Sequence, residues 1–403
     1  MIPNVDRVAG TDRCAALPTG RDTVKRLSFR GRTGAVALAG VLALSLAACS
    51  SNSDNPTPSG EGTTPGGEAT EAPAELSGTL AGAGASSQEA AEAGWIAGFA
   101  ELQPGVSVTY DAVGSGGGRE QFIAGSVQFA GSDAALKEDE ITAAGERCGG
   151  EALELPLYIS PIAVIYNLPD VSAEHIQMSA ETIAKVFNGD ITKWNDPAIA
   201  AENEGVDLPD LDIIPVHRSD ESGTTSNFTD YLAKASNGAW PYDASGDWPI
   251  EGGQSGAQTS GLLDTVNGAP GTIGYADASR AGDLGTVALK VGDEYVPYSA
   301  AAAAAVVDAS PATDDATDLR LTFSLDRTTT AAGAYPLVLV SYMLACETYD
   351  NQADVDNVKA YLSYIASAEG QERAADPSVA GSAPISDDLR ARVQAAIDSI
   401  GLA

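Results

Sequence analysis

The chain has 403 residues, 44% of them hydrophobic, and a net charge of −34 at pH 7. Its length is sufficient for two folded domains, and the excess of acidic residues argues against nucleic acid or an anionic surface as a partner. His175 and His217 are the only histidines in the chain, so a histidine-based metal site or a catalytic triad is not expected.

Residues 1–48 are predicted to be an export signal. Five basic residues within 21–32 precede an apolar run over 35–46, which is too short to span a membrane as a mature helix. The run ends in Leu46-Ala47-Ala48-Cys49, which is similar to a lipobox and implies that Cys49 becomes a lipidated first residue. Without residues 1–48, which hold seven basic and three acidic side chains, the net charge becomes −38.

Residues 49–75 are predicted to be a disordered tether. They are mostly Ser, Thr, Gly, Pro, Asn and Glu, with almost no large apolar side chain. Such a segment cannot bury enough surface to offset the entropy lost on ordering. We therefore expect it to connect a membrane anchor to a folded body that begins near Leu76.

The body alternates strand-like and helical segments, which is the pattern of an α/β sheet covered by helices. Each of four expected strands is followed by a helix, and the strands cover 80–85, 106–113, 127–130 and 213–216. Ligands in open α/β sheets bind beyond the carboxyl ends of the strands. The side chains expected to converge there are Ser86, Ser115, Asp133, Arg218 and Ser222.

Local patterns suggest how the first two helices begin. Ser86-Ser87-Gln88-Glu89 has the spacing of a capping box, so Ser86 is expected to start the first helix. An apolar stripe on that helix is expected to face the core, and it consists of Trp95, Ile96, Phe99 and Leu102. The glycine run 114–118 lacks the spacing of a dinucleotide or Walker motif. It is expected to be a turn before the second helix.

The segment 212–232 gives the clearest indication of an anion site. Its strand ends in Arg218, and Ser222-Gly223-Thr224 then opens a helix whose first N–H groups have no partner within the helix. A guanidinium fork and hydroxyl donors suit a tetrahedral oxyanion. The alternative is an ordinary N-cap beside a surface arginine, and Asp133 taken alone would also be explained as an N-cap.

Several motifs together resemble the phosphate-binding lipoproteins of the bacterial phosphate ABC importer. They are Gly82–Ser86, Gly114–Gly117, Phe129–Asp133, Phe187–Ile199, Arg218–Thr224 and Pro270–Tyr275. The resemblance implies a two-lobed periplasmic-binding-protein fold of type II with two chain crossovers. The expected lobes are 76–154 plus 334–403, and 155–333, with the cleft between them. It also implies a monomer without metal or cofactor that delivers inorganic phosphate to membrane permease subunits of an ABC transporter.

Carried over by position, the resemblance assigns phosphate contacts to Ser86, Ser115, Asp133, Arg218, Ser222, Gly223 and Thr224. Asp220 would pair with Arg218 and hold its fork in place. Two positions depart from the family. Ser86-Ser87 stands where the family often has Thr-Phe, and Glu221 stands where it often has Gly. Glu221 therefore adds a negative charge beside the expected anion site.

An aspartate in the cleft would also provide a way to reject sulfate. An ionised Asp133 can only accept hydrogen bonds, and phosphate near neutral pH still carries a proton to donate whereas sulfate carries none. Against sulfate, buried acceptors would face each other unpaired. Two rival functions fit the sequence less well. A binder of another oxyanion such as sulfate or molybdate is disfavoured by the acceptor role of Asp133. A secreted phosphatase or esterase with Ser222 as nucleophile is not expected, because the spacing does not fit a Gly-x-Ser-x-Gly elbow and His217 is the only histidine nearby.

Two cysteines are left in the exported body, Cys148 and Cys346. In an oxidising compartment such a pair is more often a disulfide than a metal site. We expect Cys148 in a turn after the third helix. Cys346 is expected to follow an apolar strand at 337–340 and the start of the next helix. A bond between them would tie the end of the body to its beginning.

Overall fold

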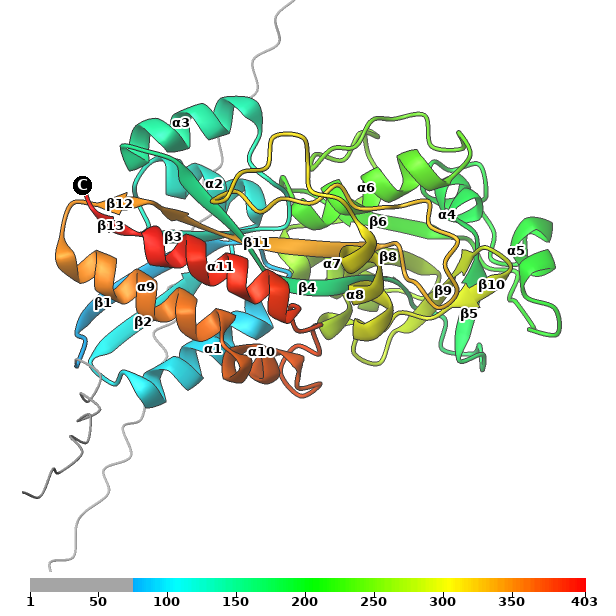
Figure 1. Ribbon diagram of the computed structural model, residues 1–403. Helices are drawn as coiled ribbons and strands as arrows, with labels where there is room; N and C mark the ends of the chain where they lie inside the picture. The colour runs from blue at the N-terminus through cyan, green and yellow to red at the C-terminus, as the bar shows by residue number, and fades with distance from the viewer. Residues whose placement is uncertain (1–74) are drawn as a thin grey trace, which may run out of the picture. The chain divides into compact units, whose positions relative to one another are not determined.

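A mixed β-sheet runs through residues 75–403, the part of the chain that this computed structural model describes (Figure 1). Its main path has the strand order β2-β1-β3-β11-β4-β8-β6-β7, and β9, β5 and β10 continue from β4. The predicted export signal, the predicted lipidation site Cys49 and all but the last residue of the predicted tether lie outside the described residues.

The strands and helices have the following bounds. The strands are β1 Gly78–Gly84, β2 Val106–Asp111, β3 Phe129–Ser132, β4 Ala152–Tyr166, β5 His175–Met178, β6 Ile214–Arg218, β7 Gln254–Gly256, β8 Thr272–Asp277, β9 Gly285–Val291, β10 Glu294–Val296, β11 Val338–Cys346, β12 Thr348–Tyr349 and β13 Gly401–Leu402. The helices are α1 Glu89–Leu102, α2 Ser115–Ile123, α3 Glu138–Cys148, α4 Ala180–Phe187, α5 Pro197–Glu202, α6 Gly223–Ala235, α7 Gln258–Asn267, α8 Ala300–Ala309, α9 Gln352–Ala366, α10 Ala368–Ala375 and α11 Asp387–Ser399.

Strands β4 and β11 form the centre of the sheet and pair antiparallel along their length. Every residue of both strands is buried, as their nearly continuous apolar sequences require. On one side β11 pairs with β3, and on the other β4 pairs with β8. We call β1–β3 with α1–α3 and α9–α11 the first group, and β5–β10 with α4–α8 the second group. The predicted lobe boundary at 154/155 falls inside β4, a strand that both groups share.

Parallel pairing within each group brings the ends of several strands to one edge. In the first group β1 lies between β2 and β3, and in the second group β6 lies between β7 and β8. The β1–β3 approach depends on glycine, because a Cβ on Gly84 would lie 2.0 Å from the carbonyl oxygen of Gly131. The polar segments that follow β1, β2 and β3 therefore leave the sheet close together. Strand β6 runs in the opposite direction, and the segment that follows it meets them from the second group.

The structure corrects three local expectations. Helix α1 begins at Glu89 after Gln88, without a side-chain cap, so Ser86 does not form a capping box. Helix α2 begins at Ser115, which places the glycines 116–118 inside its first turn. The strand expected at 337–340 continues as β11 to Cys346, because β3 and β4 supply pairing partners along its whole length. On α1, Trp95 and Phe99 are buried as predicted, whereas Leu102 is exposed.

Candidate anion-binding site

The predicted contact residues are polar yet almost completely buried. Six side chains share this property, with at most 4% of their surface exposed: Ser86, Ser115, Asp133, Arg218, Ser222 and Thr224. Burial of polar groups costs free energy unless hydrogen bonds compensate it. The partners of these residues therefore show how the site is built.

Arg218, the last residue of β6, is held by Asp220. Its Nε donates to Asp220 Oδ1 at 2.8 Å, and its Nη2 donates to Oδ2 of the same carboxylate. Burial alone would raise the pKa of Asp220, but the hydrogen bonds and charge of Arg218 hold it below its ordinary value. The backbone N–H of Gln258 also donates to Asp220 Oδ1 at 2.9 Å. The carboxylate of Asp220 thus fixes the guanidinium fork in position.

The start of α6 is packed against the first group. Ser222 is the N-cap, and its hydroxyl accepts a hydrogen bond from the N–H of Thr225 at 3.2 Å. Gly223 follows, and a Cβ there would lie 2.5 Å from Ser115 Oγ and 2.6 Å from Asp133 Cβ. Only glycine allows this approach. The positive end of a 13-residue helix is therefore placed beside Ser115 and Asp133.

Asp133 is held from both groups and caps no helix. Its Oδ1 accepts from Ser87 Oγ at 2.6 Å, and its Oδ2 accepts from Thr224 Oγ1 at 3.0 Å. Its backbone N–H donates to Ser115 Oγ at 3.1 Å. Burial raises the pKa of Asp133 above its ordinary value although hydroxyl donors and the charge of Arg218 lower it. Helix α3 begins only at Glu138, after Lys137, so the N-cap explanation for Asp133 is wrong.

Ser86 joins the groups at a second point. Its Oγ lies 3.0 Å from Thr259 Oγ1 and accepts from the Thr259 N–H at 3.1 Å. Thr259 belongs to the first turn of α7, where a hydroxyl follows a strand end, as it does at Ser222. The pattern of an apolar strand followed by a hydroxyl could have identified Thr259. However, the short strand β7 that precedes α7 has the sequence Gln-Ser-Gly and contains no apolar run.

Further supporting residues lie behind the site. Tyr275 OH accepts from the Arg218 N–H at 3.3 Å and lies 2.8 Å from Thr225 Oγ1. Asn227 Nδ2 donates to the Asp133 carbonyl oxygen at 2.7 Å, and Arg327 Nη2 donates to Asn227 Oδ1. The Asn227 and Arg327 contacts could not be predicted from local sequence patterns, because the partners are about 100 positions apart along the chain.

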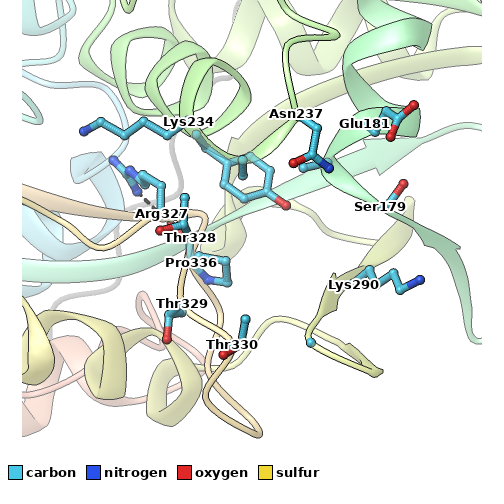
Figure 2. Close-up of a pocket in the computed structure, with 14 residues that line it drawn as sticks. Ser179, Glu181, Lys234, Asn237, Lys290, Arg327, Thr328, Thr329, Thr330 and Pro336 are labelled. Atoms are coloured by element: carbon cyan, nitrogen blue, oxygen red, sulfur yellow. Dashed lines mark hydrogen bonds between the residues drawn. The ribbon is translucent and has the colours of Figure 1, made fainter.

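A hollow of about 430 Å³ lies at another place on the second group and includes none of the predicted contact residues (Figure 2). Lys234 and Lys290 lie on opposite sides of that view, and their ammonium groups point away from each other. Lys234 is paired with Asp230 at 2.8 Å, and the Arg327 guanidinium is engaged by Asp230 and by backbone carbonyl oxygens. Two of the cations that line the hollow, Lys234 and Arg327, are therefore already paired with Asp230.

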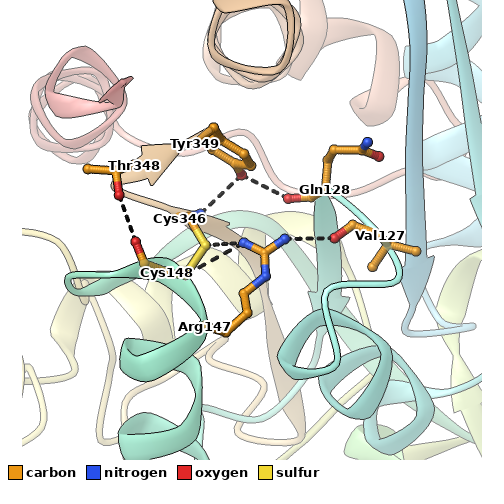
Figure 3. The surroundings of a disulfide bond; sticks show 7 residues. All are labelled: Val127, Gln128, Arg147, Cys148, Cys346, Thr348 and Tyr349. Atoms are coloured by element: carbon orange, nitrogen blue, oxygen red, sulfur yellow. Dashed lines mark hydrogen bonds between the residues drawn. A yellow bond between two sulfur atoms is a disulfide. The ribbon is translucent and has the colours of Figure 1, made fainter. Parts of the chain in front are cut away.

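Cys148, at the end of α3, is bonded to Cys346, at the end of β11, with 5.1 Å between their Cα atoms (Figure 3). The guanidinium of Arg147 lies beside the disulfide, 4.7 Å from the ring centre of Phe122, and donates to the Val127 carbonyl oxygen at 3.1 Å. Thr348 Oγ1 donates to the Cys148 carbonyl oxygen at 2.7 Å. The Thr348 hydrogen bond thus connects the segment after β11 to the end of α3 in addition to the covalent bond, and Arg147 connects the end of α3 to α2 and to the segment before β3.

Two further findings concern residues 75–403. No helix there has the length and apolar character needed to cross a bilayer. Within the same range, no group of three or more His, Cys, Asp or Glu side chains is arranged to hold a metal ion.

Comparison with known proteins places the chain in a family. Residues 69–369 match a family model described as a PBP superfamily domain. Phosphate-binding protein PstS 3 of Mycobacterium tuberculosis is 35% identical over 379 residues, which cover 93% of this chain and 100% of that protein. PstS 2 of the same organism is 34% identical over 383 residues, with the same shares covered.

Solved structures agree with the fold. A phosphate-binding protein from Stenotrophomonas maltophilia is similar with a TM-score of 0.61 and 18% identity, over 79% of this chain and 93% of that one. At this identity the likeness concerns the fold alone, and it confirms the predicted α/β architecture of the periplasmic-binding-protein type. The sequence relatives and the family model show that the chain belongs to the PstS family of phosphate-binding proteins.

Proposed function

We propose that this protein binds inorganic phosphate outside the cytoplasm and delivers it to the permease subunits of an ABC importer. The observation that carries the proposal is the meeting of Arg218, the start of α6 and the hydroxyls of both groups around Asp133. These groups offer charged and neutral donors to an oxyanion, together with one carboxylate acceptor. The names of the PstS relatives support phosphate as the ligand.

In this proposal Ser86, Ser115, Arg218, Ser222, Gly223 and Thr224 donate to the phosphate oxygens, and Asp133 accepts its proton. The two lobes, 76–154 with 334–403 and 155–333, close over the ligand as a monomer. Closure removes water and strengthens each hydrogen bond. With a net charge of −34, long-range attraction cannot capture phosphate. Local hydrogen bonds, acting within a Debye length of about 8 Å, must hold it.

An enzyme is the less suitable interpretation of the same residues. The Ser222 hydroxyl is engaged as the cap of α6. His217 Nδ1 lies 2.8 Å from the Arg218 carbonyl oxygen and its Nε2 lies 2.9 Å from the Gly252 carbonyl oxygen, so neither nitrogen is directed at Ser222. A serine nucleophile needs a base within hydrogen-bond reach. Turnover of a phosphate ester by the purified protein would reverse this conclusion.

The direct test of the proposed function is calorimetric titration of residues 76–403 with phosphate and then with sulfate. Phosphate should bind with a measurable heat, and sulfate should bind far more weakly. Equal binding of both anions would leave a general oxyanion receptor. Binding of sulfate or molybdate in preference to phosphate would identify a different substrate on the same fold.

The selectivity of the site should depend on Asp133. Asp133→Asn keeps the shape, adds a donor and removes the charge, so sulfate affinity should rise markedly while phosphate affinity changes less. In the wild type, the preference for phosphate over sulfate should weaken as pH falls towards the raised pKa of Asp133, because the protonated carboxyl becomes a donor. This preference should also be nearly independent of ionic strength, because the carboxylate acts on the anion at contact distance. Phosphate and sulfate affinities of both proteins provide the measurement, and an unchanged ratio would remove this role.

We also propose that Cys49 carries a lipid anchor on the outer face of the cell membrane. Cys49→Ser should then move the protein from the membrane fraction to the soluble fraction, because two acyl chains give stable attachment that other contacts do not replace. Fractionation followed by immunoblotting measures the shift. Membrane association that persists in this variant would show that another segment provides the anchor.

A further inference from the structure

Glu221 occupies a specific position between the two groups. It follows Asp220 in the segment after β6, and its Oε1 accepts from Arg119 Nη2 at 2.8 Å. Lys137 Nζ lies 3.6 Å from the same oxygen. Arg119 is on α2 and Lys137 immediately precedes α3, so both cations belong to the first group. The ion pairs therefore connect the segment that carries Arg218 to the opposite side of the site.

The space around Glu221 is shaped to receive a carboxylate. A Cβ on Gly116 would lie 2.3 Å from Glu221 Oε2, and a Cβ on Gly246 would lie 2.5 Å from Oε1. Gly116 is in the first turn of α2 and Gly246 is in the second group, so one wall of the slot comes from each group. Glu221 Oε2 is buried and has no hydrogen-bond partner among the described residues. The side chain is therefore held mainly through its other oxygen.

Arg119 requires this carboxylate. Its side chain is 2% exposed, and a buried guanidinium that loses a partner is strongly destabilised. Its Nε donates to both oxygens of Glu140, at 3.1 and 3.0 Å, and its Nη1 donates to Ser132 Oγ at 3.1 Å. Glu221 satisfies the remaining nitrogen. Two carboxylates and two cations thus form a locally neutral cluster, and the negative charge of Glu221 is compensated where it stands.

We propose that Glu221 is a positioning residue for phosphate, which deepens and rests on the proposed function. Its ion pair with Arg119 holds the segment 218–224 against α2, whose first residue is Ser115. The contact exists only when the two groups are close together, so it stabilises the ligand-bound arrangement and slows phosphate release. This is opposite to the effect of an uncompensated charge, which would repel phosphate and weaken binding.

Glu221→Gln tests the sign of this effect, and Glu140→Gln is its matched control. Both substitutions remove one carboxylate charge from Arg119, but Glu140 lies on α3 in the same group as Arg119. For Glu221→Gln, stopped-flow measurements should show phosphate release about tenfold faster and association little changed, as expected when a buried charge pair loses one partner. Glu140→Gln should lower the thermal midpoint while leaving the release rate within about twofold, far below the expected tenfold effect.

Tighter or unchanged phosphate binding by Glu221→Gln would overturn the proposal, and so would equal acceleration of release in both variants. A second measurement does not depend on affinity. A zero-length carbodiimide reagent should join Lys137 to Glu221 in wild-type protein, and mass spectrometry of the peptides identifies the link. If wild-type protein failed to bind phosphate, the proposed function would fail by itself. The cross-link would then decide whether Glu221 connects the groups, and its absence would refute the contact.

Discussion

Arg218→Ala should weaken phosphate binding by about 2–5 kcal/mol, because a desolvated charge-assisted pair is lost and Asp220 is left without its partner. The hydrogen bonds of Asp220 show how much it loses when Arg218 is removed. Asp220 accepts two hydrogen bonds from Arg218. After the change it keeps the hydrogen bond from the backbone N–H of Gln258 but loses both of those from the guanidinium. Calorimetric titration with phosphate measures the loss, which corresponds to a factor of about 30 or more in the dissociation constant.

Arg218→Lys separates charge from geometry. Lysine keeps the positive charge but cannot reproduce the planar fork that grips Asp220, so its affinity should fall between those of wild type and the alanine variant. Far-ultraviolet circular dichroism of each variant controls for folding. An alanine variant that binds within about twofold of wild type, far less than the expected loss, would remove Arg218 from the site.

Removing the Cys148–Cys346 disulfide should lower the free energy of unfolding by about 4–5 kcal/mol in the chain-entropy description. The two cysteines are 198 positions apart, so the bond restricts most of the unfolded body. Urea unfolding of oxidised protein and of a Cys148→Ser, Cys346→Ser double variant measures the difference. Phosphate affinity is the matched readout and should stay the same, because neither cysteine is among the proposed contact residues.

Mass spectrometry under non-reducing conditions shows whether the bond is present in exported protein. Free thiols at both positions would contradict the expectation. Equal stability of oxidised protein and the double variant would instead show that non-covalent contacts, such as the hydrogen bond from Thr348 to the Cys148 carbonyl oxygen, hold the end of α3 without the bond.

The sequence was informative where a polar residue follows an apolar strand. Ser222 illustrates this, because strand, hydroxyl, glycine and helix follow one another within a few residues and each step is a local preference. At Ser86 the local pattern and the tertiary structure differ. Its spacing favours a capping box, yet its hydroxyl contacts Thr259, 173 positions away. A tertiary contact of this kind outweighs a local preference and leaves no mark in the neighbouring sequence.

Charge pairing was even less visible in the sequence. Glu221 could only be described as a negative charge near an anion site, because its partner Arg119 is 102 positions away. The same holds for strand length. The apolar run after residue 336 is compatible with strand or helix in isolation, and the neighbours β3 and β4 determine that it continues as a strand to Cys346.

The position of β11 also has a consequence for the time at which the site forms. Strand β3 finds its neighbour on one side only in β11, with Ala130 opposite Leu344, whereas strands β5–β10 are made from one continuous stretch of chain. Strand pairs that are far apart in the sequence form slowly, because the entropy of closing a long loop is lost before the hydrogen bonds of the pair can form. Asp133, which directly follows β3, is therefore synthesised early but fixed late. A chain that stops before residue 338 contains every proposed phosphate contact and lacks the strand that pairs with β3, which directly precedes Asp133.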